Sequence, residues 1–421
     1  MSKKVRIQAS SLRGVHKIPP SKSQTMRALS FATLAQGRSI IRNYLHSPDT
    51  EAMINACRLL GAQIKVMPEI LEVEGGLRPA EDVIDAGNSG IVLRFIGAIS
   101  ALTEGYTVIT GDPSIRHRRP VKPLLEGLTQ LGAFAVSSRG DDHAPIIMKG
   151  PLKGGTALIE GEDSQPVSGL LIAAAFAPSK TELFVTNPGE KPFVDLTLSW
   201  FDKFGIPYEN DNHEKYLIPG GSTIEGFDYF VPADWSSAAY PIAAALITNS
   251  QLTIEGVDFK DAQGDKELVT LLQEMGAKFH IEGHSLTVLP GSRLKGCKID
   301  VSSFIDAITL LPVLGCFAEG TTEIVGGKIA RFKECDRIQS IVSELKKMGA
   351  RIIEQADGMI IEPSTLKGAL TESYADHRMA MSLTVAGLAA EGETVINGVE
   401  VVPKSFPGFF DRLRDIGAKI E

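Results

Sequence analysis

The pattern of hydrophobic and polar positions recurs along the chain about every seventy residues. A period of this length indicates that the fold is built from repeated structural units. Each time, an amphipathic run ends in a large apolar residue followed by glycine, and a strand-like segment comes next. A helix commonly ends in a left-handed residue, which only glycine adopts without steric cost, so each step predicts the end of a helix. The steps are Leu60-Gly61, Leu131-Gly132, Phe204-Gly205, Met275-Gly276, Met348-Gly349 and Ile416-Gly417.

A second kind of segment recurs out of phase with the first and is apolar on nearly all sides. A helix of that kind must be buried. The amphipathic runs instead carry charges on one face, for example Glu344 and Lys347, and are expected at the surface. The expected buried helices are residues 28–35, 92–102, 167–177, 236–247, 307–318 and 379–390.

Each repeat therefore holds one buried helix, one surface helix and several strands, which indicates an α/β protein. Six such units are too many for one hydrophobic core, so the sequence predicts two domains of three units each. The predicted domains are residues 20–230 and residues 1–19 with 231–421. The chain is expected to cross between them twice, near residues 12–20 and 225–235.

The composition is that of an ordinary globular protein, with 43% hydrophobic and 22% charged residues. The first residues lack the apolar core of a signal peptide, and the stretch 307–318 is far too short to span a membrane. The four cysteines show no CxxC spacing, which argues against a disulfide framework or a zinc site. We expect a cytoplasmic protein without a metal or cofactor, and the net charge of −8 gives no reason to expect nucleic acid as a partner.

Polar motifs stand at the start of every expected buried helix. Capping explains Asp234 with Ser236, and it also suits Asn88. It does not explain a further set of residues at these starts, which are Lys22, Arg27, Gln165, His377 and Arg378. Free N–H groups and the helix dipole make such starts suitable for anions. If the buried helices of each domain run parallel, two opposed faces of positive helix ends would form a cleft for a phosphorylated substrate.

Several motifs resemble signatures of the 5-enolpyruvylshikimate-3-phosphate synthase family of enolpyruvyl transferases. The similarity runs essentially end to end. The motifs are Pro20-Ser21-Lys22-Ser23, Asn88-Ser89-Gly90 with Arg94, Arg118-Arg119-Pro120, Lys333-Glu334-Cys335-Asp336-Arg337, Asp376-His377-Arg378-Met379-Ala380-Met381 and Lys404-Ser405-Phe406-Pro407. The resemblance implies two inside-out α/β domains of three repeats each, with the active site in the cleft between them.

The resemblance also implies an activity: transfer of the enolpyruvyl group of phosphoenolpyruvate to the 5-hydroxyl of shikimate 3-phosphate. Phosphate is released through a tetrahedral intermediate, a step of aromatic amino acid and chorismate biosynthesis. The implied catalytic residues are Asp306, Glu334, Lys22 and His377. The implied phosphoenolpyruvate ligands are Lys22, Gly90, Arg119, Gln165, Arg337, Arg378 and Lys404. The implied shikimate 3-phosphate ligands are Lys22, Ser23, Arg27, Ser164, Gln165, Asp306 and Lys333.

Other interpretations of two of these residues stay open at this point. Asp306 stands where a helix cap would also stand, and Glu334 lies between Lys333 and Arg337, as in a surface salt-bridge network. Three further positions depart from the family pattern, since Asp163 and Glu190 replace expected serines and Ile329 replaces an expected asparagine. An anion at Asp163 would not help phosphate binding unless its side chain turns away.

The main alternative function is enolpyruvyl transfer to UDP-N-acetylglucosamine, by enzymes that share the fold. Those enzymes carry a lysine-asparagine pair where this chain has Lys22-Ser23, and usually a cysteine in the loop around Arg119, where residues 111–122 contain none. An RNA terminal-phosphate cyclase, whose fold is related, would need a basic surface, which the net charge argues against. We therefore expect an enzyme for small anionic substrates, acting as a monomer.

Overall fold

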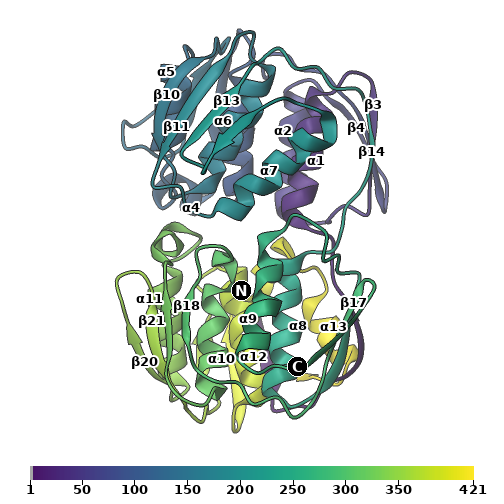
Figure 1. Cartoon of the computed structure of the whole chain (residues 1–421), viewed down its shortest axis with the longest axis vertical. Coiled ribbons are helices and arrows are strands. Elements are labelled where there is room, and N and C mark those ends of the chain that lie inside the picture. Colours follow the sequence, from purple (N-terminus) through teal and green to yellow (C-terminus); the bar gives the residue numbers. More distant parts are fainter. Residues whose placement is uncertain (1–2) are drawn as a thin grey trace. The chain divides into compact units, whose positions relative to one another are not determined.

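The computed structural model describes residues 3–421, which form two compact units. One unit is Pro20–Val231, and the other joins the preceding residues through Pro19 to Pro232–Glu421. Within each unit the sheets lie on the outside and the long apolar helices lie among them, as Figure 1 shows. This is the two-domain, inside-out α/β fold that the repeats and the family resemblance predicted.

All the four-stranded sheets follow one pattern. The first strand is parallel to the second, the third is antiparallel to the second, and the fourth is antiparallel to the third. In the unit Pro20–Val231 the sheets, in spatial order, are β14 (Asp228–Phe230), β3 (Arg38–Arg42), β5 (Ile70–Glu74), β4 (Gln63–Val66); β6 (Ile84–Asp85), β7 (Tyr106–Thr110), β9 (Ile146–Lys149), β8 (Phe134–Ser137); and β10 (Gly155–Glu160), β11 (Thr181–Thr186), β13 (Lys215–Ile218), β12 (Glu209–Asp211). In the other unit they are β2 (Arg13–Lys17), β15 (Gln251–Glu255), β17 (Ser285–Val288), β16 (Phe279–Glu282); β18 (Lys298–Asp300), β19 (Thr322–Val325), β21 (Met359–Glu362), β20 (Arg351–Glu354); and β22 (Leu370–Glu372), β23 (Glu393–Asn397), β1 (Lys4–Gln8), β24 (Lys419–Ile420).

The helices divide into an inner and an outer set, as their polarity predicted. The inner helices are α1 (Lys22–Leu34), η1 (Val92–Ile96) with α3 (Gly97–Ser100), α6 (Ser164–Phe176), α8 (Trp235–Ile247), η3 (Ile305–Thr309) with α10 (Leu311–Phe317), and α12 (His377–Ala389). The outer helices are α2 (Pro48–Leu59), α5 (Lys122–Gln130), α7 (Lys191–Phe204), α9 (Glu267–Glu274), α11 (Arg337–Lys347) and α13 (Phe409–Asp415). Shorter turns are α4 (Pro113–His117), η2 (Gly264–Lys266), η4 (Lys328–Phe332) and η5 (Val399–Lys404).

The apolar-glycine steps end the outer helices as predicted. Each of these glycines has a positive φ, between 64° at Gly205 and 112° at Gly61. A side chain at such a φ would clash with the backbone, which explains why glycine recurs there.

Two inner helices are less regular than their apolar pattern suggested. Residues 92–102, expected to form one helix, begin with the π-helical turn η1 before α3. Residues 307–318 begin within the 3₁₀ turn η3, and the α-helix starts only at Leu311, with Pro312 in its first turn. Proline fits the first turn of a helix because its missing N–H has no intrahelical partner there.

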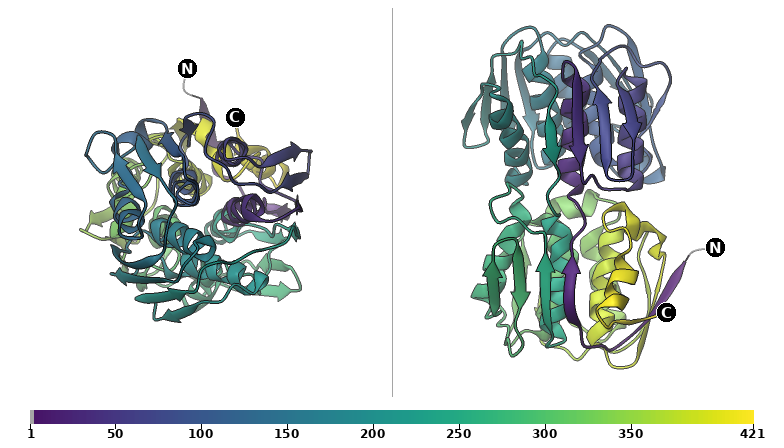
Figure 2. Two further views of the ribbon diagram at one scale, coloured as in Figure 1. Left: turned by 90° about the horizontal axis from the view of Figure 1, so that it is seen from above. Right: turned by 90° about the vertical axis from the view of Figure 1, so that its right-hand side faces the viewer.

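The unit Pro20–Val231 is one continuous segment, whereas the other unit is built from two segments of the chain. Strands β1 and β2 belong to the sheets of Pro232–Glu421, and the right view of Figure 2 shows these purple strands in the same unit as the yellow C-terminal segment. Strand β14 precedes α8 in the chain but pairs in parallel with β3. Among residues 3–421, no helix is long and apolar enough to cross a membrane.

Candidate functional site

In the unit that contains Pro232–Glu421, the starts of three inner helices meet at one guanidinium. Arg378, in the first turn of α12, donates from Nη1 to the carbonyl oxygen of Ser236 (3.0 Å) and from Nη2 to its hydroxyl (2.6 Å) in α8. Nη2 also donates to Oδ2 of Asp306 in η3, at 2.8 Å. A single buried cation therefore ties together the positive ends of α8, η3 and α12.

A second buried guanidinium, Arg337 at the start of α11, is surrounded by carboxylates. It donates to Asp306 (2.9 Å), to Asp376 (2.8 Å) and to Glu334 (3.0 Å). Burial alone would lower the pKa of Arg337, but the carboxylates of Asp376, Glu334 and Asp306 raise it well above its ordinary value. The guanidinium is thus permanently charged and held in a fixed orientation.

Asp306 and Glu334 each bridge two cations. One oxygen of Asp306 accepts from Arg337 and the other from Arg378, so the structure gives this carboxylate an ionic role rather than the capping role left open by the sequence. Glu334 accepts from Arg337 and from Nζ of Lys404, the latter at 2.6 Å. Its side chain is only 8% exposed, so these ion pairs are not a surface network.

Two other predicted residues flank this cluster. His377 is the first residue of α12 and is buried, with Nδ1 lying 3.7 Å from Oδ1 of Asp376. Lys333 directly follows η4 and is half-buried next to Glu334. The cluster therefore collects the predicted residues of this unit, which are Asp306, Lys333, Glu334, Arg337, His377, Arg378 and Lys404.

In the unit Pro20–Val231, predicted residues gather around Gly90. A Cβ atom at Gly90 would lie 2.9 Å from Oε1 of Gln165 and 3.0 Å from Nη1 of Arg119. Nη1 of Arg94 would be 3.1 Å away. The backbone at Gly90 is thus approached by two guanidinium groups and a buried amide oxygen, Oε1 of Gln165, that has no hydrogen-bond partner within residues 3–421. Such a buried polar group indicates a ligand position.

Arg94 accounts for the unusual Asp163. Nη2 of Arg94 lies 3.0 Å from Oδ2 of Asp163 and also donates to the carbonyl oxygen of Pro120. The other carboxylate oxygen of Asp163 accepts from the N–H of Gln165 and caps α6. The carboxylate of Asp163 is therefore neutralised by a cation and occupied as a cap.

Arg27, in α1, is buried among neutral partners. Its guanidinium donates to the hydroxyl of Thr197 (2.9 Å), to the carbonyl oxygen of Phe193 (2.7 Å) and to that of Ser23 (3.2 Å), and it lies 5.2 Å from the ring centroid of Phe95. Burial lowers the pKa of Arg27 to about 9. A buried cation of this kind gains from a bound carboxylate, because the anion offsets the cost of desolvation.

Two further predicted residues, Lys22 and Ser164, lie at the starts of inner helices. Nζ of Lys22, the first residue of α1, lies 3.4 Å from Oδ2 of Asp49 in α2. Ser164 begins α6, and its N–H and hydroxyl both donate to Oε2 of Glu190, at 3.1 and 2.9 Å. The unexpected Glu190 thus occupies the position at which the resemblance placed the phosphate of the substrate.

Sequence reasoning did not assign Arg94 or Asp376 to the site, and it named Glu190 only as the replacement of an expected serine. Arg94 and Asp376 stand inside the quoted motifs, so their charge was a usable signal. Glu190 lies 26 residues beyond Ser164, and nothing local in the sequence connects the two.

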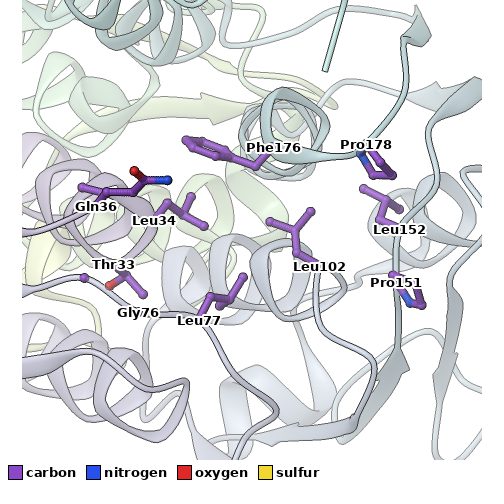
Figure 3. A pocket seen from close by; sticks show the side chains of 12 residues that line it. Thr33, Leu34, Gln36, Gly76, Leu77, Leu102, Pro151, Leu152, Phe176 and Pro178 are labelled. Atoms are coloured by element: carbon purple, nitrogen blue, oxygen red, sulfur yellow. The ribbon is translucent and has the colours of Figure 1, made fainter. Parts of the chain in front are cut away.

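A cavity of about 400 Å³ lies elsewhere, at the C-terminal ends of the inner helices of Pro20–Val231. Figure 3 shows Leu34, Leu102 and Phe176 facing it, and none of the side chains that line it is charged. Its chemistry does not suit charged phosphates, so it is distinct from the helix starts described above. The described residues hold no group of three or more His, Cys, Asp or Glu side chains arranged for a metal ion.

Comparison with known proteins gives a consistent result. Residues 7–413 match the family described as EPSP synthase (3-phosphoshikimate 1-carboxyvinyltransferase). The chain is 44% identical to the 3-phosphoshikimate 1-carboxyvinyltransferase of Acetivibrio thermocellus, over 99% of both chains, and 42% identical to that of Chlamydia pneumoniae, over 99% of this chain and 94% of the other. A solved EPSP synthase from Acinetobacter baumannii superposes with a TM-score of 0.82 at 28% identity, covering 100% of this chain and 99% of that one.

Proposed function

Because the chain belongs to the EPSP synthase family, we propose a role for each charged cluster in the reaction of a 3-phosphoshikimate 1-carboxyvinyltransferase. The enzyme transfers the enolpyruvyl group of phosphoenolpyruvate to shikimate 3-phosphate and releases phosphate. Enolpyruvyl transfer to UDP-N-acetylglucosamine is not favoured by the family to which the chain belongs.

Phosphoenolpyruvate would be held by the cations of the clusters described above. Arginine presents parallel donors that match the oxygens of carboxylate and phosphate, whereas lysine acts as a point charge. The absent side chain at Gly90 would let backbone N–H groups approach the phosphate. The proposed ligands are Lys22, Gly90, Arg119, Gln165, Arg337, Arg378 and Lys404.

Shikimate 3-phosphate would be bound mainly at the starts of α1 and α6. Arg27 is suited to its carboxylate because that guanidinium is buried without a carboxylate among its hydrogen-bond partners described above. Ser164 and Lys333 would bind the phosphate, and Asp306 the ring hydroxyls. The full proposed set is Lys22, Ser23, Arg27, Ser164, Gln165, Asp306 and Lys333.

Asp306 is proposed to remove the proton from the 5-hydroxyl, whose oxygen then attacks C2 of phosphoenolpyruvate. C3 takes a proton from Glu334 in the same addition, which gives the tetrahedral intermediate. Elimination returns the proton from C3 to the enzyme as the C2–O bond to phosphate breaks. Glu334 is a carboxylate between Lys404 and Arg337 in the free protein. The anionic groups of phosphoenolpyruvate would compete for these cations and so raise the proton affinity of Glu334.

Lys22 and His377 are proposed as further catalytic groups. Each stands in the first turn of an inner helix and next to a carboxylate, Asp49 for Lys22 and Asp376 for His377. The positive charge of Lys22 and an N–H of the His377 imidazole would stabilise negative charge that develops on phosphate and on the intermediate.

The observation that supports this proposal is the double bridging of Asp306 by Arg337 and Arg378, because this carboxylate lies between two guanidinium groups suited to binding an anionic substrate. The test is a phosphate-release assay with phosphoenolpyruvate, offering shikimate 3-phosphate and UDP-N-acetylglucosamine in parallel. We expect release only with shikimate 3-phosphate. Release that depends on the UDP-sugar would contradict the assignment.

We also propose that the protein acts in the cytoplasm as a monomer on these two small anions, without a cofactor or nucleic acid. The net charge of −8 and the scattered cysteines support this. Light scattering after gel filtration should give the mass of one chain, 45.2 kDa.

A further inference from the structure

The segment that leads into α12 is a strained turn. The N–H of Asp376 donates to the carbonyl oxygen of Ser373 at 3.0 Å, and the two residues between them, Tyr374 and Ala375, both have a φ of 54°. Positive φ at both central positions is the pattern of a type I′ turn, which favours glycine, asparagine and aspartate. A tyrosine and an alanine adopt it only at a cost in conformational energy.

The equivalent turn before η1 has a different composition. There the N–H of Ser89 donates to the carbonyl oxygen of Ala86 at 2.9 Å, and Gly87 supplies the positive φ of 55°. Glycine adopts this conformation without strain. The turn at residues 373–376 therefore has two strained positions, whereas the turn at residues 86–89 has a single positive φ, at a glycine.

Glu344 of α11 makes that contact. Its carboxylate is fully buried and accepts from the hydroxyl of Tyr374 (2.7 Å) and from the N–H of Glu372 (3.1 Å). Nζ of Lys347 donates to both of its oxygens at 2.8 Å, which neutralises the charge. A hydrogen bond to a charged acceptor is among the stronger single contacts in proteins.

The turn fixes the position of Asp376, on which two arginines depend. One oxygen of Asp376 accepts from the N–H of Arg378, and the other accepts from Nε of Arg337. Movement of the turn would therefore displace the guanidinium of Arg337 directly, and that of Arg378 through its backbone. Both arginines are proposed ligands of phosphoenolpyruvate. Glu344 itself lies behind this layer and bonds to Tyr374, Glu372 and Lys347 rather than to the arginines.

We propose that Glu344 and Tyr374 form a latch that holds the strained turn and so positions Arg337 and Arg378 for phosphoenolpyruvate. Both are positioning residues that act through Asp376, and the inference rests on the ligand roles proposed above. Loss of the latch should therefore raise KM for phosphoenolpyruvate more than KM for shikimate 3-phosphate.

The test compares Tyr374→Phe with Tyr208→Phe. Tyr208 also donates to a carboxylate, Asp202 at 3.1 Å, but in the other unit. We expect Tyr374→Phe to raise KM for phosphoenolpyruvate by about three- to tenfold, the range of a weakened single charged hydrogen bond. KM for shikimate 3-phosphate should stay unchanged, and Tyr208→Phe should leave both constants at wild-type values. Glu344→Gln should reproduce the Tyr374→Phe effect if it remains folded by thermal unfolding.

A rescue experiment separates positioning from simple loss of stability. Ala375→Gly removes strain from the turn, so adding it to Tyr374→Phe should restore KM for phosphoenolpyruvate. Absence of rescue, an equal rise in both KM values, or kinetics of Tyr374→Phe equal to those of Tyr208→Phe would each overturn the latch.

Arg337→Lys serves as the reference for the ligand assignment. If Arg337→Lys leaves KM for phosphoenolpyruvate unchanged, the proposed ligand role is wrong. If Arg337→Lys is defective and Tyr374→Phe is normal, only the latch is wrong.

Discussion

Glu190 accepts hydrogen bonds from both the N–H and the hydroxyl of Ser164, at the positive end of α6. The carboxylate is buried, and Glu190 has a φ of 44°, which a residue other than glycine rarely adopts. Contacts with its surroundings must therefore hold Glu190 in this conformation. A negative group at this position competes with any anion that binds to Ser164.

Glu190→Gln should therefore lower KM for shikimate 3-phosphate by several-fold. Glutamine can still accept from Ser164, but it removes the negative charge that repels the phosphate. KM for phosphoenolpyruvate should change less. Glu182→Gln is the matched control, because it removes the same charge from a half-buried carboxylate of β11 that pairs with Lys180. Equal kinetics of the two variants would contradict this role.

Asp306→Asn should reduce kcat by about 10²–10⁴-fold, the usual contribution of a general base. Asparagine is nearly isosteric but cannot take up the proton of the 5-hydroxyl. Asp300→Asn, at a nearby exposed carboxylate that accepts from the N–H of Ser302, should keep wild-type kcat. If Asp306→Asn keeps more than a few per cent of wild-type kcat, the proton acceptor is another group.

Gly90→Ala should raise KM for phosphoenolpyruvate, because the added methyl group would lie within 3.1 Å of Gln165, Arg119 and Arg94. The charged side chains would have to move by a few tenths of an ångström, away from the position of the phosphate. Steady-state kinetics should show a larger change for phosphoenolpyruvate than for shikimate 3-phosphate. A larger change for shikimate 3-phosphate than for phosphoenolpyruvate would indicate that the phosphate of shikimate 3-phosphate binds at Gly90 instead.

Phe95→Leu should weaken binding of shikimate 3-phosphate, because the ring of Phe95 lies beneath the guanidinium of Arg27. A buried cation–π contact contributes about 0.5–2 kcal/mol, so KM should rise by up to roughly thirtyfold. Phe201→Leu removes a ring of the same size from the same unit, where it packs against Phe31. If the two variants show the same KM for shikimate 3-phosphate, Phe95 contributes to packing only and not to binding of this substrate.

Asp265→Asn should stabilise the protein at neutral pH and lose this advantage in acid. Burial raises the pKa of Asp265 well above its ordinary value, and the carboxylates of Asp306 and Asp234 raise it further, against a lowering effect of Arg378. The folded state therefore binds a proton that the unfolded state releases above about pH 4, so wild-type stability falls as the pH rises from there to the folded pKa. Asparagine does not titrate. Denaturant unfolding at several pH values should show that the difference in unfolding free energy between Asp265→Asn and wild type grows with pH. A difference that stays constant with pH would contradict a protonated Asp265.

The repeated pattern of the sequence was sufficient for the architecture but not for the ends of the inner helices. Helix α1 begins at Lys22, six residues before the expected start at residue 28. The apolar pattern missed these residues because Gln24 and Arg27 are polar and nevertheless buried. Gln24 is satisfied by the indole N–H of Trp200, which is 176 residues away in the chain. A criterion based on apolar periodicity cannot anticipate such a partner.

The candidate site shows the same limit. The identity of its charged residues could be predicted, since Asp306, Arg337 and Arg378 stand in recognisable motifs. Their pairing could not, because each bond joins segments 31 to 72 residues apart. The bond between Glu190 and Ser164 depends likewise on the return of the chain through β11, which no local pattern encodes.

Strand β1 lies between β23 and β24, paired with residues nearly 400 positions later in the chain. During synthesis on the ribosome this strand emerges long before its neighbours, so Val5 and Ile7, both buried in the finished sheet, stay exposed to water until β23 and β24 are made. The unit Pro20–Val231 has all its strands much earlier. Nascent chains stalled far enough beyond residue 231 for the whole unit to have left the exit tunnel should accordingly contain one protease-resistant unit and a protease-sensitive segment before it.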